Sequence, residues 1–204
     1  MSNVVVRRVE SKKDLKKFVK VPFHVHRDHP EWVPPLILER MDFLNRKKNP
    51  YFDHAEVELL IAERDGVPVG RISAQIDSRW DEYRGGNDGQ FGFFETIDDA
   101  EVADALLDAG CEWLAGKGRE KVYGPMDFTT NDEIGIQIEG FDIRPVILEN
   151  CHQPYVKDLV EGNGFTKAMD LLMWHLEMGK LAKGLEFHPA IMEAAQKSLD
   201  EHGI

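Results

Sequence analysis

The sequence has few of the features that mark secreted, membrane-spanning or nucleic-acid-binding proteins. Its 204 residues include two cysteines, Cys111 and Cys151, which is too few for a disulfide framework, so we expect a cytoplasmic protein. No apolar run is long enough to cross a bilayer. The N-terminus places a short valine run before its basic residues, the reverse of a secretory signal. We therefore expect no membrane partner.

Positive charge is also scarce. The chain carries 25 basic and 37 acidic residues, a net charge of −12. Because binding of nucleic-acid phosphates needs surplus Lys and Arg, this balance argues against a nucleic-acid partner. One basic stretch covers residues 7–20, where Leu15, Phe18 and Val19 are spaced like one apolar face of a helix. We interpret its lysines as the solvated face of that helix.

The remaining pattern predicts a mixed sheet flanked by helices. Asp65-Gly66 between two apolar runs is a strong hairpin signal, and Ser11 and Asp98 or Asp99 are suitable helix N-caps. The predicted strands cover residues 4–6, 56–64, 67–77, 89–97, 119–126 and 165–178. The predicted helices cover residues 11–20, 35–44, 100–117 and 155–162, with polar or irregular segments at 81–90 and 127–150 and a last helix from Pro189.

This order of elements predicts an α/β protein of the α+β type with a mostly antiparallel sheet. We expect one domain over residues 1–178, and a linker with a C-terminal helix over residues 179–204.

Three segments resemble the GNAT superfamily of N-acyltransferases. They are the hairpin ending in VPVGRISAQ, the strand at 91–97 with the following DDAEVADALLDAGCEWLAGKGREKVYG, and YVKDLVEGNGFTKAMDLLMWHLE. The likeness covers roughly residues 3–178 as an order of elements. WVPPL, Phe93-Phe94 and TTNDEIG resemble a little-characterised bacterial GNAT-like family, whose members often have a second half. The resemblance implies transfer of an acyl group from acetyl-CoA or another acyl-CoA to a small-molecule amine, without a metal.

In the superfamily, acyl-CoA lies between the fourth and fifth strands, which implies contacts with Phe93, Phe94, Thr96 and Ile97. Its phosphates bind a glycine-rich loop at the start of the following helix. Here Asp98 stands at the usual Arg or Gln, Glu101 stands at a glycine, and Ala103 alone fits. Carboxylates at a helix start cap the N–H groups that a phosphate would use, so the loop departs strongly from the pattern.

The resemblance also implies catalytic positions. The usual tyrosine of the last helix is replaced by Val160, and Tyr155 five residues earlier is the candidate general acid. Glu95 is the candidate general base, or else a half-buried strand carboxylate paired with a neighbour. Asn131, Asp132 and Glu133 follow the fifth strand, where they form either a substrate site or an Asx-turn.

The histidines His24, His26 and His29 match no zinc-binding spacing, so we interpret them as loop histidines and expect no metal. Two hypotheses follow, an acyltransferase and a GNAT-fold binding or assembly module without turnover. A groove filled by Phe91, Phe93 or Phe94 would favour the module. The apolar side of the helix after Pro189 predicts either a homodimer or a second GNAT-like half.

Overall fold

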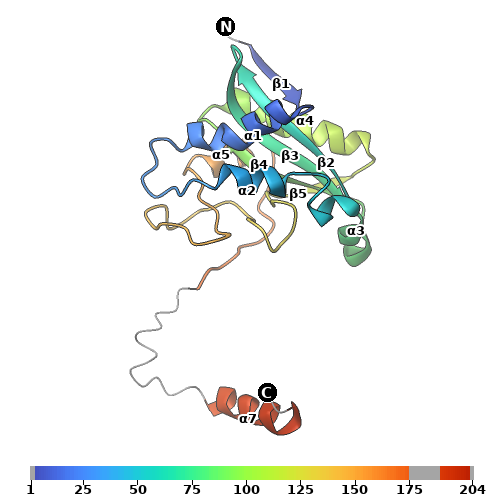
Figure 1. The fold of residues 1–204 in the computed structure, drawn as a ribbon, viewed down its shortest axis with the longest axis vertical. Coiled ribbons are helices and arrows are strands. Elements are labelled where there is room, and N and C mark those ends of the chain that lie inside the picture. Colours follow the sequence, from blue (N-terminus) through green and yellow to red (C-terminus); the bar gives the residue numbers. More distant parts are fainter. Residues whose placement is uncertain (1–2, 175–188, 203–204) are drawn as a thin grey trace. The chain divides into compact units, whose positions relative to one another are not determined.

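The computed structural model describes residues 3–174 and 189–202. The chain divides into two units, Met1–Ala168 and Met169–Ile204. In the first unit, helices pack on a five-stranded sheet whose strands follow one another in chain order (Figure 1). Neighbouring strands are antiparallel except for β4 and β5, which are parallel. This arrangement is the predicted α/β fold of the GNAT type.

The elements of the first unit are β1 (Val4–Arg8), α1 (Lys12–Val25), α2 (Ile37–Phe43), a 3₁₀ turn (Pro50–Asp53), β2 (Ala55–Arg64), β3 (Val67–Asp77), α3 (Ser78–Arg84), β4 (Asp88–Thr96), α4 (Ala100–Gly116), β5 (Lys121–Tyr123) and α5 (Val156–Gly162). The second unit contains α7 (Pro189–His202), which confirms the predicted helix start. Residues 179–188, the predicted linker, lie outside the described residues.

Side-chain alternation along the sheet creates one apolar core on each face. On β2, Leu60 and Ala62 point to the face covered by α4 and α5, whereas Leu59 and Ile61 point to the face covered by α1 and α2. The consecutive aromatics of β4 divide in the same way: Phe91 and Phe94 join the first core and Phe93 joins the second. The predicted burial of this strand on both faces is confirmed.

The predicted end of α1 at Lys20 is wrong, because the helix continues to Val25 through Pro22. Proline has no N–H to donate to the carbonyl of Phe18, four residues earlier. The Arg71 side chain of β3 supplies a donor instead, with its Nη1 lying 3.4 Å from that oxygen. The extension carries the end of α1 over the sheet and places His26 at its C-cap.

Two other predicted elements differ from the structure. The polar loop expected at 81–90 contains the end of α3, which the Asp77 side chain caps and Gly85 ends in the left-handed region. The final strand expected at 165–178 is not a strand over residues 165–174, and its remaining residues lie outside the described part. A strand needs a partner for its backbone groups, and the described residues of the sheet provide none for this segment.

No helix within residues 3–174 or 189–202 combines the length and apolar character needed to cross a membrane.

The start of α4 is closed by its own carboxylates. The Asp99 side chain accepts a hydrogen bond from the Val102 N–H at 3.2 Å and pairs with Arg64 Nη1 at 2.5 Å. Arg64 Nη2 also reaches Glu101 at 2.8 Å. This cluster joins the end of β2 to the first turn of α4.

We therefore expect Asp99→Ala to lower the free energy of unfolding by about 1 kcal/mol, because the helix loses its N-cap. The pairing with Arg64 holds the pKa of Asp99 below its usual value. The stabilisation is thus present above the unfolded-state pKa and is lost as the pH falls through the lowered folded-state value. Urea unfolding at several pH values measures this. The exposed Asp98→Ala is the matched control, and an equal loss in both variants would contradict the capping role.

Candidate active site

Glu95 lies at the centre of a cluster of charged and polar side chains on the α1 face of the sheet. It stands opposite Arg71 in the register of β3 and β4. One residue of β3, Ile72, faces two residues of β4, Phe93 and Phe94, which makes a bulge just before Glu95. At this bulge Phe93 adopts a φ of +48°. The irregularity turns the side chain of Glu95 toward the end of α1.

His26 pairs with Glu95 from that helix end. Its Nε2 lies 2.7 Å from Glu95 Oε2, and its side chain is fully buried. Arg71 Nη2 lies 3.9 Å from the other carboxylate oxygen. Burial would raise the pKa of Glu95, but His26, Arg71 and His152 outweigh it and hold the pKa below the ordinary value. Glu95 is therefore an ionised carboxylate.

The second ring nitrogen of His26 is left without a partner. Its Nδ1 is buried and has no hydrogen-bond partner among the described residues. Since an ionised carboxylate accepts the hydrogen bond at Nε2, that nitrogen carries a proton, and in the neutral imidazole the lone pair is then on Nδ1. Nδ1 thus lacks the hydrogen bond that buried polar groups normally make.

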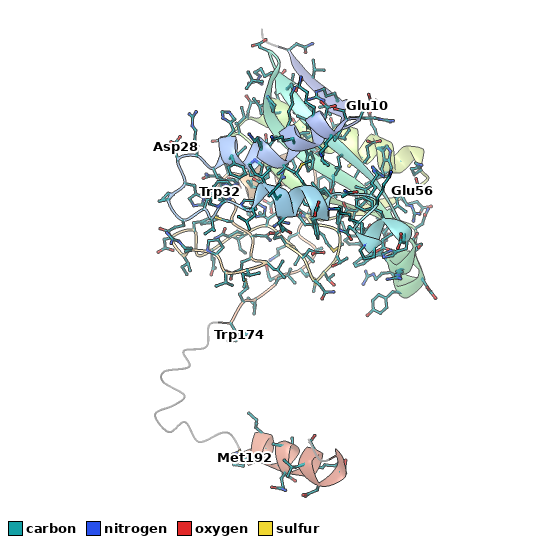
Figure 2. All side chains as sticks on the ribbon, viewed as in Figure 1. Glu10, Asp28, Trp32, Glu56, Trp174 and Met192 are labelled. Atoms are coloured by element: carbon teal, nitrogen blue, oxygen red, sulfur yellow. The ribbon has the colours of Figure 1, made fainter. Side chains whose placement is uncertain are left out.

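An aromatic cover lies over His26. The Trp32 ring stacks on the imidazole with centroids 5.2 Å apart and an interplanar angle of 13°. The Phe23 ring packs edge-on against the Trp32 ring, with centroids 5.2 Å apart. Trp32 belongs to the proline-rich loop between α1 and α2 (Figure 2). The loop therefore covers one face of the imidazole ring.

Asp127 fixes the bulge from the segment that follows β5. Its Oδ1 accepts a hydrogen bond from the Phe93 N–H at 2.6 Å. Removal from water and the nearby carboxylate of Glu133 raise the pKa of Asp127 well above its usual value. Glu133 itself pairs with Arg40 of α2. A second carboxyl cluster therefore lies beside the first, and α2 supplies its positive charge.

The structure separates the three residues predicted to bind substrate. Glu133 belongs to the cluster around Asp127, whereas Asp132 accepts hydrogen bonds from the N–H and hydroxyl of Thr129 at 3.1 and 2.7 Å. Asn131 is exposed, and its N–H donates to Thr129 Oγ1 at 3.2 Å. These bonds make a turn centred on Thr129, whose hydroxyl accepts from Asn131 and whose N–H donates to Asp132, rather than the Asx-turn that the sequence offered as the alternative.

Tyr155 reaches the same strand from the start of α5. Its hydroxyl donates to the backbone carbonyl of Thr96 at 2.9 Å. Burial raises the pKa of Tyr155, so the hydroxyl keeps its proton. His152 lies nearby as a buried neutral ring, since burial lowers its pKa and its Nδ1 accepts from the Gln137 N–H at 3.2 Å.

The predicted cofactor-binding residues are packed into the protein. Phe93 and Phe94 are 2% exposed, and Ala103 and Thr96 are buried. The Ile97 N–H donates to the Val69 carbonyl at 3.0 Å. With the Phe93 N–H bound to Asp127 and the Thr96 carbonyl bound to Tyr155, much of the backbone here already has partners.

One cysteine–histidine contact lies close to the Glu95 cluster, and it adds no nucleophile. Cys151 Sγ is 3.7 Å from His29 Nδ1. Burial, together with Glu95 and Glu31, raises the pKa of Cys151 to about 11, so it is a thiol at neutral pH. Outside the site, His54 Nδ1 pairs with Asp77 Oδ1 at 2.8 Å, a His–carboxylate pair of similar length.

His26 is the residue that sequence reasoning missed. Interpreting it as a loop histidine is wrong, because it is buried in an ion pair. Phe18 and Pro22 are buried on α1, and His26 continues the same i, i+4, i+8 spacing. That signal is visible in the sequence once the helix is allowed to pass Pro22. The contribution of Arg71 depends on strand register, which carries no such local signal.

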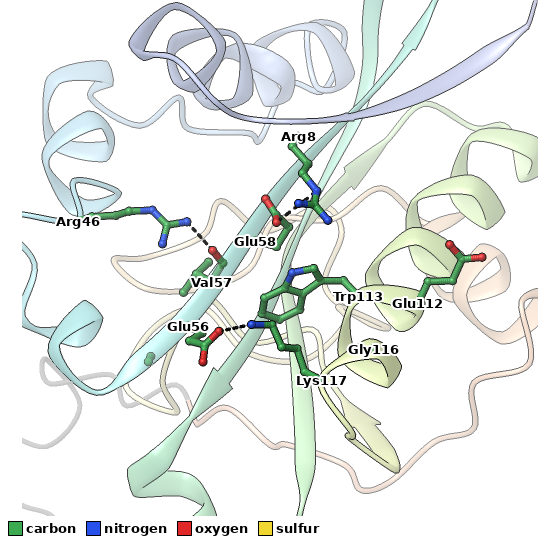
Figure 3. Close-up of a pocket in the computed structure, with 10 residues that line it drawn as sticks. Arg8, Arg46, Glu56, Val57, Glu58, Glu112, Trp113, Gly116 and Lys117 are labelled. Atoms are coloured by element: carbon green, nitrogen blue, oxygen red, sulfur yellow. Dashed lines mark hydrogen bonds and ion pairs between the residues drawn. The ribbon is translucent and has the colours of Figure 1, made fainter.

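A separate pocket of about 620 Å³ opens beside β2 and the end of α4 (Figure 3). Its basic groups already have partners: Lys117 pairs with Glu56 at 2.6 Å, Arg8 lies 3.5 Å from Glu58, and Arg46 donates to the Val57 carbonyl. None of the predicted site residues lines it. The pocket therefore offers no acid–base group comparable with the Glu95 cluster.

No protein-family model matches the chain. The bacterial ceramide synthase of Caulobacter vibrioides is 40% identical over 167 residues, which are 81% of this chain and 44% of that protein. Protein YghO of Escherichia coli is 38% identical over 187 residues, 92% of this chain and 47% of that protein. The chain thus spans about half the length of the curated relatives it matches.

Solved acetyltransferases share the fold. An aminoglycoside acetyltransferase from an uncultured soil sample, bound to sisomicin, has a TM-score of 0.51 at 13% identity and covers 85% of this chain and 95% of its own. An acetyltransferase from Clostridium acetobutylicum, solved with acetyl-CoA, has a TM-score of 0.52 at 12% identity and covers 85% and 96%. At such identities the likeness establishes the fold alone.

The Asp127–Phe93 contact yields a test of the site's architecture. We expect Asp127→Asn to leave stability nearly unchanged at acidic pH, where the wild-type carboxyl is protonated, because the amide oxygen still accepts from the Phe93 N–H. Asp127→Ala leaves that N–H without an acceptor and costs about 1–3 kcal/mol.

The pH dependence has a defined sign. A raised carboxyl pKa contributes stability that is complete below the unfolded-state pKa and is lost as the pH rises through the folded-state value. Asp127→Asn should therefore gain stability relative to the wild type toward alkaline pH. Urea unfolding across that range measures it. If the Asn and Ala variants are equally destabilised at every pH, the assigned hydrogen bond is wrong.

Proposed function

We propose, on the premise that this chain is a protein of the GNAT acyltransferase fold, that it transfers an acyl group from an acyl thioester to an amine. The observation that carries the proposal is the buried His26–Glu95 pair with its unpartnered Nδ1. The pair lies at the bulge of β4. This is the strand beside which the superfamily resemblance places the acyl donor. A base and a positioned thioester suffice for amide formation.

The relative with 40% identity narrows the proposed substrates. It is a ceramide synthase, and a ceramide is the amide of a fatty acid and a long-chain amine. We therefore infer that the acceptor is a long-chain lipid amine and that the donor is a fatty acyl thioester, acyl-CoA included. The thioester supplies an activated acyl carbon and a thiolate leaving group.

His26 acts as the general base in this proposal. Glu95 accepts the hydrogen bond from Nε2–H and fixes the tautomer, so that Nδ1 takes the proton lost by the attacking amine. The Glu95 carboxylate then stabilises the positive imidazolium, which is the role of the carboxylate in His–carboxylate pairs. The amine nitrogen bonds to the acyl carbon as the carbon–sulfur bond breaks.

Tyr155 is the proposed acid for the departing thiolate. Its raised pKa keeps it protonated at neutral pH, and its hydroxyl already lies at the backbone of Thr96. One proton passes to His26 and one leaves Tyr155, and both groups then exchange protons with solvent. Trp32 covers one face of the His26 ring, and we infer that movement of its loop admits the amine.

One observation favours a second candidate, a GNAT-fold binding module without turnover. Phe91, Phe93 and Phe94 are each 2% exposed and fill the space beside β4. The same measurements decide between the two candidates. Thiol release that depends on His26 supports the enzyme, whereas absence of both turnover and thioester binding supports the module.

The activity test uses a fatty acyl-CoA and a long-chain primary amine, with thiol release as the readout. We expect His26→Ala to lower kcat/KM by about 10²–10⁴-fold, because the base is lost. Glu95→Gln should lower it less and shift the pH profile, since the amide no longer stabilises the imidazolium. His54→Gln changes the corresponding pair outside the site and should retain activity. Activity that survives His26→Ala would overturn the assignment of the base.

The closed start of α4 generates a binding prediction. Because Asp99 and Glu101 occupy the first turn, we expect no phosphate contact there, and an acyl-CoA and the matching acyl-pantetheine should bind with similar affinity. Calorimetric titration measures both.

The variant Asp99→Asn with Glu101→Gln keeps a capping side chain and removes two charges. It should strengthen acyl-CoA binding by about 2- to 5-fold and leave acyl-pantetheine unchanged. Much tighter acyl-CoA binding in the wild type would contradict this.

A further inference from the structure

The outer face of α1 is a continuous basic stripe in an otherwise acidic chain. Lys13, Lys16, Lys20 and His24 are exposed at helical spacing, and Arg27 continues the line beyond the helix end. The opposite side of the helix is buried against the sheet. Among the residues that the structure describes, Lys13, Lys16 and Lys20 form no ion pair. With a net charge of −12, this local surplus of positive charge stands out from the composition.

The stripe leads into a loop whose apolar side chains face solvent. Residues 33–38, VPPLIL, contain no charge, and Val33, Leu36 and Leu38 are 50%, 76% and 84% exposed. These side chains belong to the loop that carries Trp32 and to the first turn of α2 (Figure 2). Three large apolar side chains in six residues, each at least half exposed, are unusual for a surface in contact with water alone.

A second apolar loop lies beside the first. Val146, Ile147 and Leu148 are 67%, 91% and 55% exposed. Arg144, just before them, lies 3.8 Å from Glu31 of the first loop. Figure 1 shows both loops at the same end of the domain. We call residues 33–38 and 146–148 the apolar loops.

We propose that the α1 stripe and the apolar loops together bind the surface of a lipid bilayer that contains anionic lipids. Lysines attract the negative headgroups, and apolar side chains at loop ends insert at the boundary of the acyl chains. An acidic protein partner would account for the lysines but not for the exposed apolar side chains of the loops. The expectation of no membrane partner considers only segments that span a bilayer, and a surface contact requires none.

The surface deepens the proposed function and rests on it. Trp32, which stacks on His26, directly precedes the first apolar loop. If residues 33–38 enter the bilayer, the cover moves with them, and a long-chain amine dissolved in the membrane meets the base without passing through water. Lipid contact and opening of the site are then a single motion.

Vesicle co-sedimentation of the purified protein tests the proposal. We expect binding to vesicles of phosphatidylcholine with phosphatidylglycerol, little binding to phosphatidylcholine alone, and weaker binding at high salt. Lys16→Gln with Lys20→Gln should lower the partition coefficient by about fivefold for each lysine. Leu36→Ser with Leu38→Ser should lower it as well, at any salt concentration. Lys121→Gln and Val67→Ser change an exposed lysine and a 53% exposed valine elsewhere, and should bind as the wild type does.

Three results would overturn the proposal. One is absence of binding to anionic vesicles, and another is equal binding by the Lys16/Lys20 variant and the Lys121 control. The third is salt-sensitive binding that is the same with and without Leu36 and Leu38, which would indicate adsorption through charge alone, without insertion of the apolar loops. Vesicle binding needs no turnover, so His26→Ala should bind normally. An inactive wild type that still binds vesicles would therefore reject the proposed function and retain this surface.

Discussion

A carboxylate set into a sheet must find positive charge or hydrogen-bond donors close by, because leaving a charge unpaired away from water costs several kcal/mol. Glu95 finds them on two separate segments: His26 at the end of α1 and Arg71 on β3. Both segments must therefore hold their positions for the ionised state to persist. The charge of one side chain thus ties α1 to the sheet. This pairing also leaves His26 with Nε2 hydrogen-bonded to Glu95 and with Nδ1 without a partner among the described residues.

The position of α1 also depends on Arg71, which replaces a hydrogen-bond donor that the helix lacks. Pro22 leaves the Phe18 carbonyl without its helical donor, and Arg71 supplies one while its guanidinium lies over the Phe18 ring, 5.0 Å from the centroid. The same guanidinium faces Glu95. Arg71 therefore couples the continuation of α1 past Pro22 to the charge of Glu95. Without that continuation the chain would turn earlier, and His26 would not reach β4.

Much of the fold follows from local chemistry that the sequence displays. Asp65 and Gly66 have φ angles of +52° and +78°, as the Asp-Gly turn predicts, and the sheet pairs around them. Ser11 and Asp99 cap the helices that they precede. The sequence identifies Glu95 as a candidate because its strand is recognisable. Pairing of its carboxylate with a neighbouring side chain was one of the two alternatives. The identity of its partners was not predictable, since His26 and Glu95 are 69 positions apart in the sequence. Pairing at such separations is set by tertiary packing rather than by spacing.

The closed start of α4 separates two tasks that the GNAT resemblance places side by side. In the superfamily pattern, one helix start holds the donor's phosphates while the adjacent strand aligns its thioester. Here Arg64, Asp99 and Glu101 satisfy that helix start with protein charges, whereas β4 keeps its bulge and the Glu95 carboxylate. An anion can displace an internal carboxylate cap only by recovering both the lost hydrogen bond and the lost Arg64 pair, in competition with charges already in place. Selectivity for the donor should therefore depend on its acyl and thioester parts. Such recognition suits a protein whose proposed substrates differ from one another mainly in their apolar chains.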